Sequence, residues 1–289
     1  MLTLDLESRP AQPVPTPVAE AAWAAIRADF GLNPDGKVRI IKHGGNTKLD
    51  HEMVRNPTAL IASHTLPSGR VNGTCVNDTH CAVTCVVDKS FRATTSQVAT
   101  ARQALLALLK ADADAYATLM VRDVRALALR ADRNDQTLVV RPNVGSDVAW
   151  ERWLPGEFWD AISDAGGHAY DYTKRIDRVG HLIPGVYRTT YSSTSATRLS
   201  TVKRILDRGD TVTAVLRQPA NPRDKSVPPT FAGFPMVSGD ATDNRFLDPA
   251  GVIVGLSAKG QLVRQWRRTG QWGALVATFD NHAKQGDRK

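Results

Sequence analysis

Short apolar stretches of strand character alternate with longer amphipathic stretches along most of this chain of 289 residues. A chain that alternates in this way forms βαβ units around a parallel sheet. We count roughly six such units, and we find neither a glycine-rich dinucleotide fingerprint nor a P-loop. The sequence therefore favours an α/β fold with a full or partial (β/α) barrel. An open α/β sheet is the second possibility.

The expected elements follow from the spacing of apolar residues. We expect strands at residues 37–42, 58–66, 137–142, 169–172, 186–191, 211–217, 234–237 and 251–256. We expect helices at residues 18–30, 95–109, 113–130, 155–165 and 196–207. Residues 44–49 are expected as a turn, residues 218–233 as a loop, and Gly166 with Gly167 as the end of a helix.

This pattern divides the chain into three parts. Residues 1–43 form an N-terminal extension with a proline-rich lead-in, a helix and a strand. Residues 44–262 form the barrel-like domain, and residues 263–289 form a basic C-terminal tail.

All three cysteines of the chain lie within eleven residues, as Cys75, Cys81 and Cys85. They follow an expected strand directly, and thiolates suit both zinc and iron–sulfur clusters. His80 could complete a zinc site with them, whereas three thiolates alone would leave one iron of a [4Fe–4S] cluster open. A plainer interpretation is a group of small buried residues, or one disulfide with a spare thiol.

Polar residues follow several of the expected strands. In parallel α/β folds such residues meet at the carboxyl edge of the sheet. We predict cofactor binding by Asn143, Ser146, Asp147 and Ser192. We predict catalytic roles for Asp171, Lys174, Asp240, Asp243 and Arg245. The serines have an alternative role as helix caps, and the lysine has one as a solvated surface residue.

The chain carries 37 Lys and Arg against 29 Asp and Glu, a formal net charge of +8. This excess favours anionic partners such as nucleic acids or nucleotides. A mildly basic protein without such a partner fits equally well, because the charge is spread along the chain rather than gathered in one block. The sequence does not indicate an oligomeric state.

The sequence predicts a cytoplasmic protein without a membrane partner. No apolar run approaches the roughly 18 residues that a bilayer-spanning helix needs. The first twenty residues contain acids and prolines where a signal peptide would have a basic region and an apolar core. In a reducing compartment, clustered thiols favour metal ligation over disulfides.

Seven motifs occur in a fixed order between about residues 44 and 262. They are N-T-K-L at 46–49, the cysteine loop, V-x-S-D-x-x-W-E at 144–151, Y-D-Y-T-K at 170–174, T-Y-S at 190–192, G-D-A-T-D at 239–243 and G-V-I-V-G-L at 251–256. In these motifs the chain resembles the phage and plasmid proteins called gene product 88. The resemblance implies a role in a mobile genetic element, such as those of actinobacteria, but no particular reaction.

The position of the cysteines also resembles the layout of radical S-adenosylmethionine enzymes. Those enzymes place three cysteines after the first strand of a partial β/α barrel, usually as C-x3-C-x2-C, whereas the spacing here is C-x5-C-x3-C. The resemblance implies a [4Fe–4S] cluster whose open iron holds S-adenosylmethionine.

Two functions from different classes remain in view. The first is an iron–sulfur enzyme of the radical S-adenosylmethionine type, with a nucleic acid or nucleotide as candidate substrate. The alternative is a zinc-containing nucleic-acid-binding protein that acts in phage or plasmid replication or regulation. A strand-nicking initiator with Tyr172 or Tyr191 as nucleophile is disfavoured, because the chain has no paired-histidine metal motif. It also has no G-x-S-x-G or H-E-x-x-H motif.

Overall fold

The structure is a computed structural model that describes residues 9–35, 38–44, 47–75, 85, 95–216, 226–258, 263, 268 and 269. The chain divides into two compact units. The first contains Met1–Val76, Phe91–Asp171 and His181–Tyr187. The second contains Asn77–Ser90, Tyr172–Gly180 and Arg188–Lys289.

The first unit is built from helices packed on a short sheet. Its helices are α1 (Thr16–Asp29), α2 (Thr47–Arg55), α3 (Ser96–Ala111), α4 (Ala113–Arg133), α5 (Trp150–Trp153) and α6 (Gly156–Asp164), with a 3-10 turn at Arg70–Asn72. Its strands are β1 (Lys42–His43), β2 (Ala59–Ser63), β3 (Thr137–Arg141) and the first part of β4 (His168–Thr173), in that order. It also contains most of β5 (Gly180–Ile183). Strand β1 is antiparallel to β2, whereas β2, β3 and β4 run parallel.

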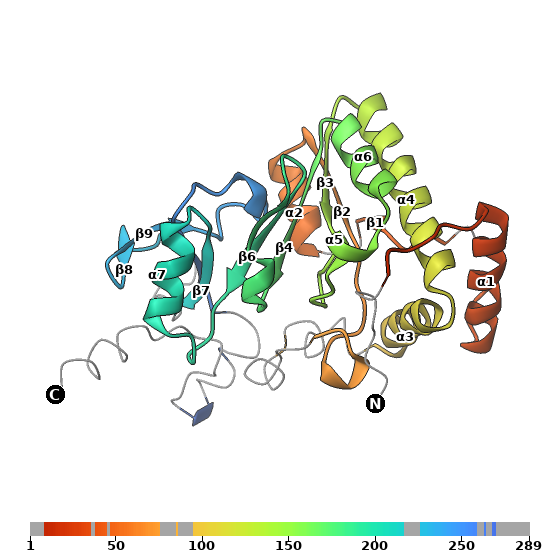
Figure 1. Cartoon of the computed structure of the whole chain (residues 1–289), viewed down its shortest axis with the longest axis horizontal. Coiled ribbons are helices and arrows are strands. Elements are labelled where there is room, and N and C mark those ends of the chain that lie inside the picture. Colours follow the sequence, from red (N-terminus) through yellow and green to blue (C-terminus); the bar gives the residue numbers. More distant parts are fainter. Residues whose placement is uncertain are drawn as a thin grey trace. The chain divides into compact units, whose positions relative to one another are not determined.

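Helix α4 is the centre of this unit. It begins where the Asp112 side chain accepts a hydrogen bond of 2.9 Å from the backbone N–H of Ala115, which caps the helix. Its buried side chains, such as Leu119 and Leu127, pack toward β2 and β3, and α1, α3 and α6 pack around it (Figure 1). Helix α2 packs against β2. The middle residues of β2 and β3 are buried on both faces, which explains their continuous apolar sequences.

The outer face of α4 is charged. This helix has 21 residues and is the longest of those described. Arg122, Arg125, Arg130 and Arg133 alternate with its apolar residues along the sequence. In the part of the chain that the structure describes, no helix is both long and apolar enough to cross a membrane.

Among its described residues, the second unit has a mostly parallel sheet on which a helix packs. Its strands are β6 (Tyr187–Ser192), β7 (Val212–Leu216), β10 (Ile253–Ser257), β9 (Phe234–Ser238) and β8 (Thr230–Phe231), in sheet order. Strands β6, β7, β10 and β9 run parallel, and β8 is antiparallel to β9. Helix α7 (Leu199–Asp207) buries Val202 and Ile205 against Val212 and Ile253. Two 3-10 turns occur at Ile176–Arg178 and Arg245–Leu247.

The α/β class expected from the sequence is confirmed, and the ten described strands are mostly parallel. The barrel is not found. Among the described strands the order has two ends, β1 and β8, and each end strand is antiparallel to its neighbour. Alternation of strands and helices predicts parallel pairing but not closure, because closure requires the first and last strands to pair. The open sheet, the second possibility, describes these strands.

Several local expectations were also wrong. The turn expected at residues 44–49 gives way to α2, which begins at Thr47, and the strand expected at 37–42 is reduced to the two residues of β1. The expected loop at 218–233 contains β8, whose hairpin to β9 turns through Ala232 (φ 51°) and Gly233 (φ 82°). Two positive φ values are typical of a type I′ turn. The expected helix end at Gly166 (φ 60°) is confirmed.

Candidate functional site

Cys75 lies beside the loop that follows β3. Its thiol donates a hydrogen bond to the carbonyl oxygen of Gly145, with a sulfur–oxygen distance of 3.6 Å. One residue earlier, the Thr74 carbonyl accepts a bond of 2.7 Å from the backbone N–H of Asp147. Because β2 and β3 run parallel, the cysteine loop and this second loop both start from the carboxyl edge of the sheet.

The predicted residues Asn143 and Asp171 are hydrogen-bonded to each other. The Asp171 carboxylate accepts bonds from the Asn143 backbone N–H (2.8 Å) and from the Asn143 side-chain amide (3.0 Å). It also accepts a bond of 2.8 Å from the Tyr187 hydroxyl. All three residues are buried, Asp171 completely. These three hydrogen bonds offset the free-energy cost of removing the carboxylate from water.

The side-chain oxygen of Asn143 holds together the loop that follows β3. This oxygen accepts bonds from the Ser146 hydroxyl (2.7 Å), the Val148 backbone N–H (3.1 Å) and the Trp150 indole (2.9 Å). The Asn143 amide also donates to the Val148 carbonyl at 2.9 Å. The side chains of Asn143 and Ser146 thus form hydrogen bonds within the loop, whereas Asp147, the residue after Ser146, is half-exposed.

The other predicted metal ligands are less well defined. Cys81, like His80, lies outside the described residues. Cys85 is half-exposed and belongs to the second unit, whereas Cys75 belongs to the first. Within the described residues, which lack Cys81 and His80, no group of three or more His, Cys, Asp and Glu side chains could hold a metal ion. The three-cysteine centre stays a prediction.

The sequence analysis missed His64, which directly follows β2 and is completely buried. Its Nδ1 lies 2.9 Å from the Pro142 carbonyl oxygen, and its Nε2 contacts the hydroxyl of Tyr116 on α4. A carbonyl only accepts, so Nδ1 carries the proton and Nε2 accepts from Tyr116. Burial lowers the pKa of His64 to about 4, which keeps the ring neutral. The available signal was a histidine shortly after the apolar run A-L-I-A of the strand.

In the second unit, the predicted residues Lys174 and Ser192 meet. The Lys174 ammonium donates to both the backbone oxygen and the hydroxyl of Ser192, each at 3.1 Å. Both residues are half-exposed. Lys174 follows β4 and Ser192 ends β6, so this pair also lies at strand ends.

The predicted residues after β9 lie in a tight turn. The Asp240 carboxylate accepts a bond of 2.9 Å from the backbone N–H of Ser257 at the end of β10. Asp243 and Arg245 are each 1% exposed. The Arg245 guanidinium donates to the Thr242 carbonyl, and its Nη1 lies 2.7 Å from where a Cβ on Gly239 would stand. Gly239 is therefore needed for this close approach.

Two further charged residues in this cluster escaped the sequence analysis. Arg188 on β6 is 4% exposed and donates to the Asp248 carbonyl oxygen at 2.7 Å. The Asp248 carboxylate lies 3.5 Å from the Arg245 Nε. Burial raises the pKa of Asp248 to about 6, although both arginines oppose that rise, and burial lowers the pKa of Arg188. Sixty residues separate Arg188 from Asp248, so no local sequence pattern signals their contact.

The predicted site residues thus fall into two sets. The first unit holds Cys75, Asn143, Ser146, Asp147 and Asp171. The second unit holds Cys85, Lys174, Ser192, Asp240, Asp243 and Arg245. Their assignment to cofactor binding and catalysis stays a prediction.

A comparison with models of protein families shows the family to which the chain belongs. A family model described as gene product 88 matches residues 39–273, most of the chain. The chain belongs to the gene product 88 family. The sequence resemblance to gene product 88 is therefore confirmed. No curated protein and no solved structure matches the chain. The resemblance to radical S-adenosylmethionine enzymes accordingly stays a prediction.

Proposed function

We propose that this gene product 88 protein is an iron–sulfur enzyme whose cluster is held by Cys75, Cys81 and Cys85. The observation that carries the proposal is the place of Cys75, a half-exposed thiol 3.6 Å from Gly145 at the carboxyl edge of β2 and β3. Parallel α/β proteins place their functional groups at this edge. The other two thiols follow within ten residues, which is short enough for all three to reach one centre.

The loop after β3 supports a cofactor beside that centre. Asp147 is half-exposed and its backbone is bonded to the residue before Cys75, so we assign it a contact with the cofactor. S-adenosylmethionine on the open iron is the cofactor we propose. Asn143, Ser146 and Asp171 are positioning residues in this proposal, because their hydrogen bonds fix the loop that presents Asp147.

The second unit, taken by itself, carries cationic groups that suit an anionic ligand. Lys174 is half-exposed, and Arg188 and Arg245 add buried guanidiniums. Cationic side chains of this kind recognise phosphate and carboxylate groups. We propose a nucleotide or nucleic acid as the substrate class, with Asp240 and Asp243 as the acidic groups of the reaction.

Metal analysis of anaerobically purified protein tests the proposal. We expect about four iron and four sulfide per chain, with a broad absorption band near about 400 nm. The Cys81→Ala variant should lose the iron and the band. With the cluster present, cleavage of S-adenosylmethionine under reducing conditions is the next measurement.

Replacement of His80 separates the cluster from the zinc alternative. A cluster held by three thiolates keeps its iron in His80→Ala, whereas a Cys3His zinc site loses most of its metal affinity. His51→Ala, which changes an exposed histidine on α2, is the matched control. About one zinc and no colour would overturn the enzyme and favour the zinc-containing nucleic-acid-binding protein. Protein without metal would overturn both.

A further inference from the structure

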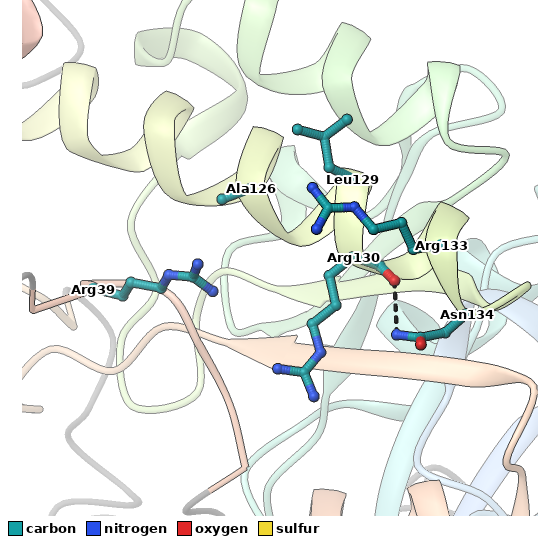
Figure 2. Close-up of a pocket in the computed structure, with 6 residues that line it drawn as sticks. All are labelled: Arg39, Ala126, Leu129, Arg130, Arg133 and Asn134. Carbon is teal, nitrogen blue, oxygen red and sulfur yellow. Dashed lines mark hydrogen bonds between the residues drawn. The ribbon is translucent and has the colours of Figure 1, made fainter.

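A hollow of about 490 Å³ opens on the first unit. It is lined by Arg39, Ala126, Leu129, Arg130, Arg133 and Asn134. Figure 2 shows Arg39 reaching in from the segment before β1, and Arg130 and Arg133 projecting from the last turns of α4. Among the described residues, no predicted site residue and no acidic residue lines it.

The three arginines of the hollow have no acidic partner in the part of the chain that the structure describes. Among the described residues, neither Arg39 nor Arg133 forms an ion pair. Arg130 donates to Nε2 of His43 at 2.6 Å, a contact that requires a neutral imidazole. Burial, followed by the charges of Arg130 and Arg39, lowers the pKa of His43, whereas Asp50 raises it. The histidine therefore lies in a region of positive potential.

Three other exposed arginines of the chain are paired with carboxylates. Arg9 lies 2.9 Å from Asp114, Arg125 lies 3.2 Å from Glu157, and Arg208 lies 2.8 Å from Asp210. Like charges three residues apart on a helix, such as Arg130 and Arg133, destabilise each other slightly. A cluster of unpaired guanidiniums around a hollow is thus arranged for an anion supplied from outside.

We propose that the hollow lined by Arg39, Arg130 and Arg133 binds the phosphate backbone of a nucleic acid. Guanidiniums donate paired hydrogen bonds to phosphate oxygens, and an open hollow lets a continuous chain of phosphates pass. The exposed Leu129 (57%) and Asn134 offer apolar and hydrogen-bonding contacts to the sugars beside them. The formal net charge of +8 adds attraction over a longer range. This site does not depend on the proposed metal centre.

Fluorescence anisotropy with a labelled DNA duplex of about 20 base pairs tests the proposal. In the triple variant Arg39→Gln, Arg130→Gln, Arg133→Gln we expect affinity to fall about tenfold or more at about 100 mM salt. The slope of log affinity against log salt should become shallower by about two to three, since each lost phosphate contact removes about 0.9.

A matched triple variant controls for net charge. Arg9→Gln, Arg125→Gln, Arg208→Gln removes the same three charges from exposed but paired positions, and we expect it to change affinity by less than about threefold. Equal losses in the two triple variants, or no binding by the wild-type protein, would overturn the proposal. So would displacement of the DNA by inorganic phosphate beyond the effect of chloride at equal ionic strength, because that result indicates a site for small anions.

The metal centre and the hollow can fail separately. Cys81→Ala should lose metal and keep its DNA affinity, whereas the hollow variant should keep its metal and lose DNA affinity. Loss of DNA affinity in Cys81→Ala with the fold intact would place the nucleic acid at the cysteine loop instead. Circular dichroism of each variant confirms that the fold is intact.

Discussion

Each compact unit buries a set of polar side chains, and the two sets differ in how far their hydrogen bonds are completed. In the first unit, the Asp171 carboxylate accepts three donors, and the Asn143 amide both donates and accepts. In the second unit, the described residues offer no hydrogen-bond partner to Nη1 of Arg245 or to Nε of Arg188. Nε of Arg245 and one carboxylate oxygen of Asp248 form only an ion pair of 3.5 Å, without a hydrogen bond.

This difference predicts opposite effects of the two sets on the stability of the fold. A buried donor or acceptor without a partner costs about 1–3 kcal/mol, so the second set lowers stability where the first set raises it. Costs of this kind are typical of functional sites, where polar atoms are reserved for a ligand, a water or an ion. We therefore expect substitutions in the first set to act mainly on stability, and the charges of the second set to oppose folding.

The largest effect is expected at Asp171. Asp171→Ala leaves the Asn143 N–H groups and the Tyr187 hydroxyl without their acceptor, so the free energy of unfolding should fall by about 3–5 kcal/mol. Urea denaturation measures it. The control is Asp207→Ala, which removes an exposed carboxylate paired with Lys203 on α7 and should change stability by less than about 0.5 kcal/mol. Similar values for the two variants would show that the network does not stabilise the first unit.

Acid should also weaken the first unit through His64. Its pKa is about 4 in the folded chain and 6.5 as the reference value, so the unfolded chain takes up the proton first as pH falls. The contribution of His64 is complete above about pH 6.5 and is lost toward pH 4, with about 2 kcal/mol lost between pH 7 and pH 5. His64→Asn keeps a donor toward Pro142 but cannot be protonated, so it should lack this loss. His51→Asn, the exposed control, should retain it.

A third substitution probes the packing around the charged cluster. A Cβ at Gly239 would lie 2.6 Å from Val254, 2.7 Å from Arg245 and 2.7 Å from Leu256, closer than real contacts allow. Gly239→Ala should therefore cost about 1–2 kcal/mol in urea denaturation. Gly156→Ala is the control, because there the nearest atom is a carboxylate oxygen of Asp160 at 3.8 Å. A stable Gly239→Ala would mean that Arg245 moves easily, and the cluster would then be loosely held.

The sequence predicted best where one local pattern determines the structure. Apolar runs and helical spacing led to β2, β3, α4 and α7, and the glycine pair after α6 marked a real helix end. Closure of the sheet could not be predicted, because it depends on pairing between distant strands. The β8–β9 hairpin escaped because Ala232 adopts a positive φ, which short-range rules assign to Gly, Asn or Asp.

The sequence predicted where candidate site residues lie along the chain better than it predicted their hydrogen bonds. Strand ends pointed to Asn143 and Asp171, but their direct hydrogen bond depends on burial that the sequence does not reveal. His64 and Tyr116 are 52 residues apart, and their contact has no local signal. The sequence around Arg188 indicates only a strand residue, because its partner Asp248 lies 60 residues further along the chain.

The smallest effect, and the sharpest test of the comparison, lies at Asp248. Its pKa is about 6 in the folded chain against 3.8 as the reference value, so the folded chain holds the proton more tightly. Stability from this group is complete below about pH 3.8 and is lost as pH rises toward 6, which is the opposite of His64. Between pH 5 and pH 7 the wild-type protein should lose about 1 kcal/mol relative to Asp248→Asn, as measured by urea denaturation at both pH values.

The control for Asp248 is Asp207→Asn, an exposed carboxylate that should show no such pH-dependent difference. A wild-type protein that instead gains stability over Asp248→Asn as pH rises would mean that Arg245 and Arg188 hold the carboxylate ionised. Attraction would then outweigh burial in the second unit, its charges would stabilise the fold as the Asp171 network does in the first, and the contrast between the two sets would fail. The expected loss would mean that the second unit retains its buried charges at a cost to folding, as a site that serves a ligand does.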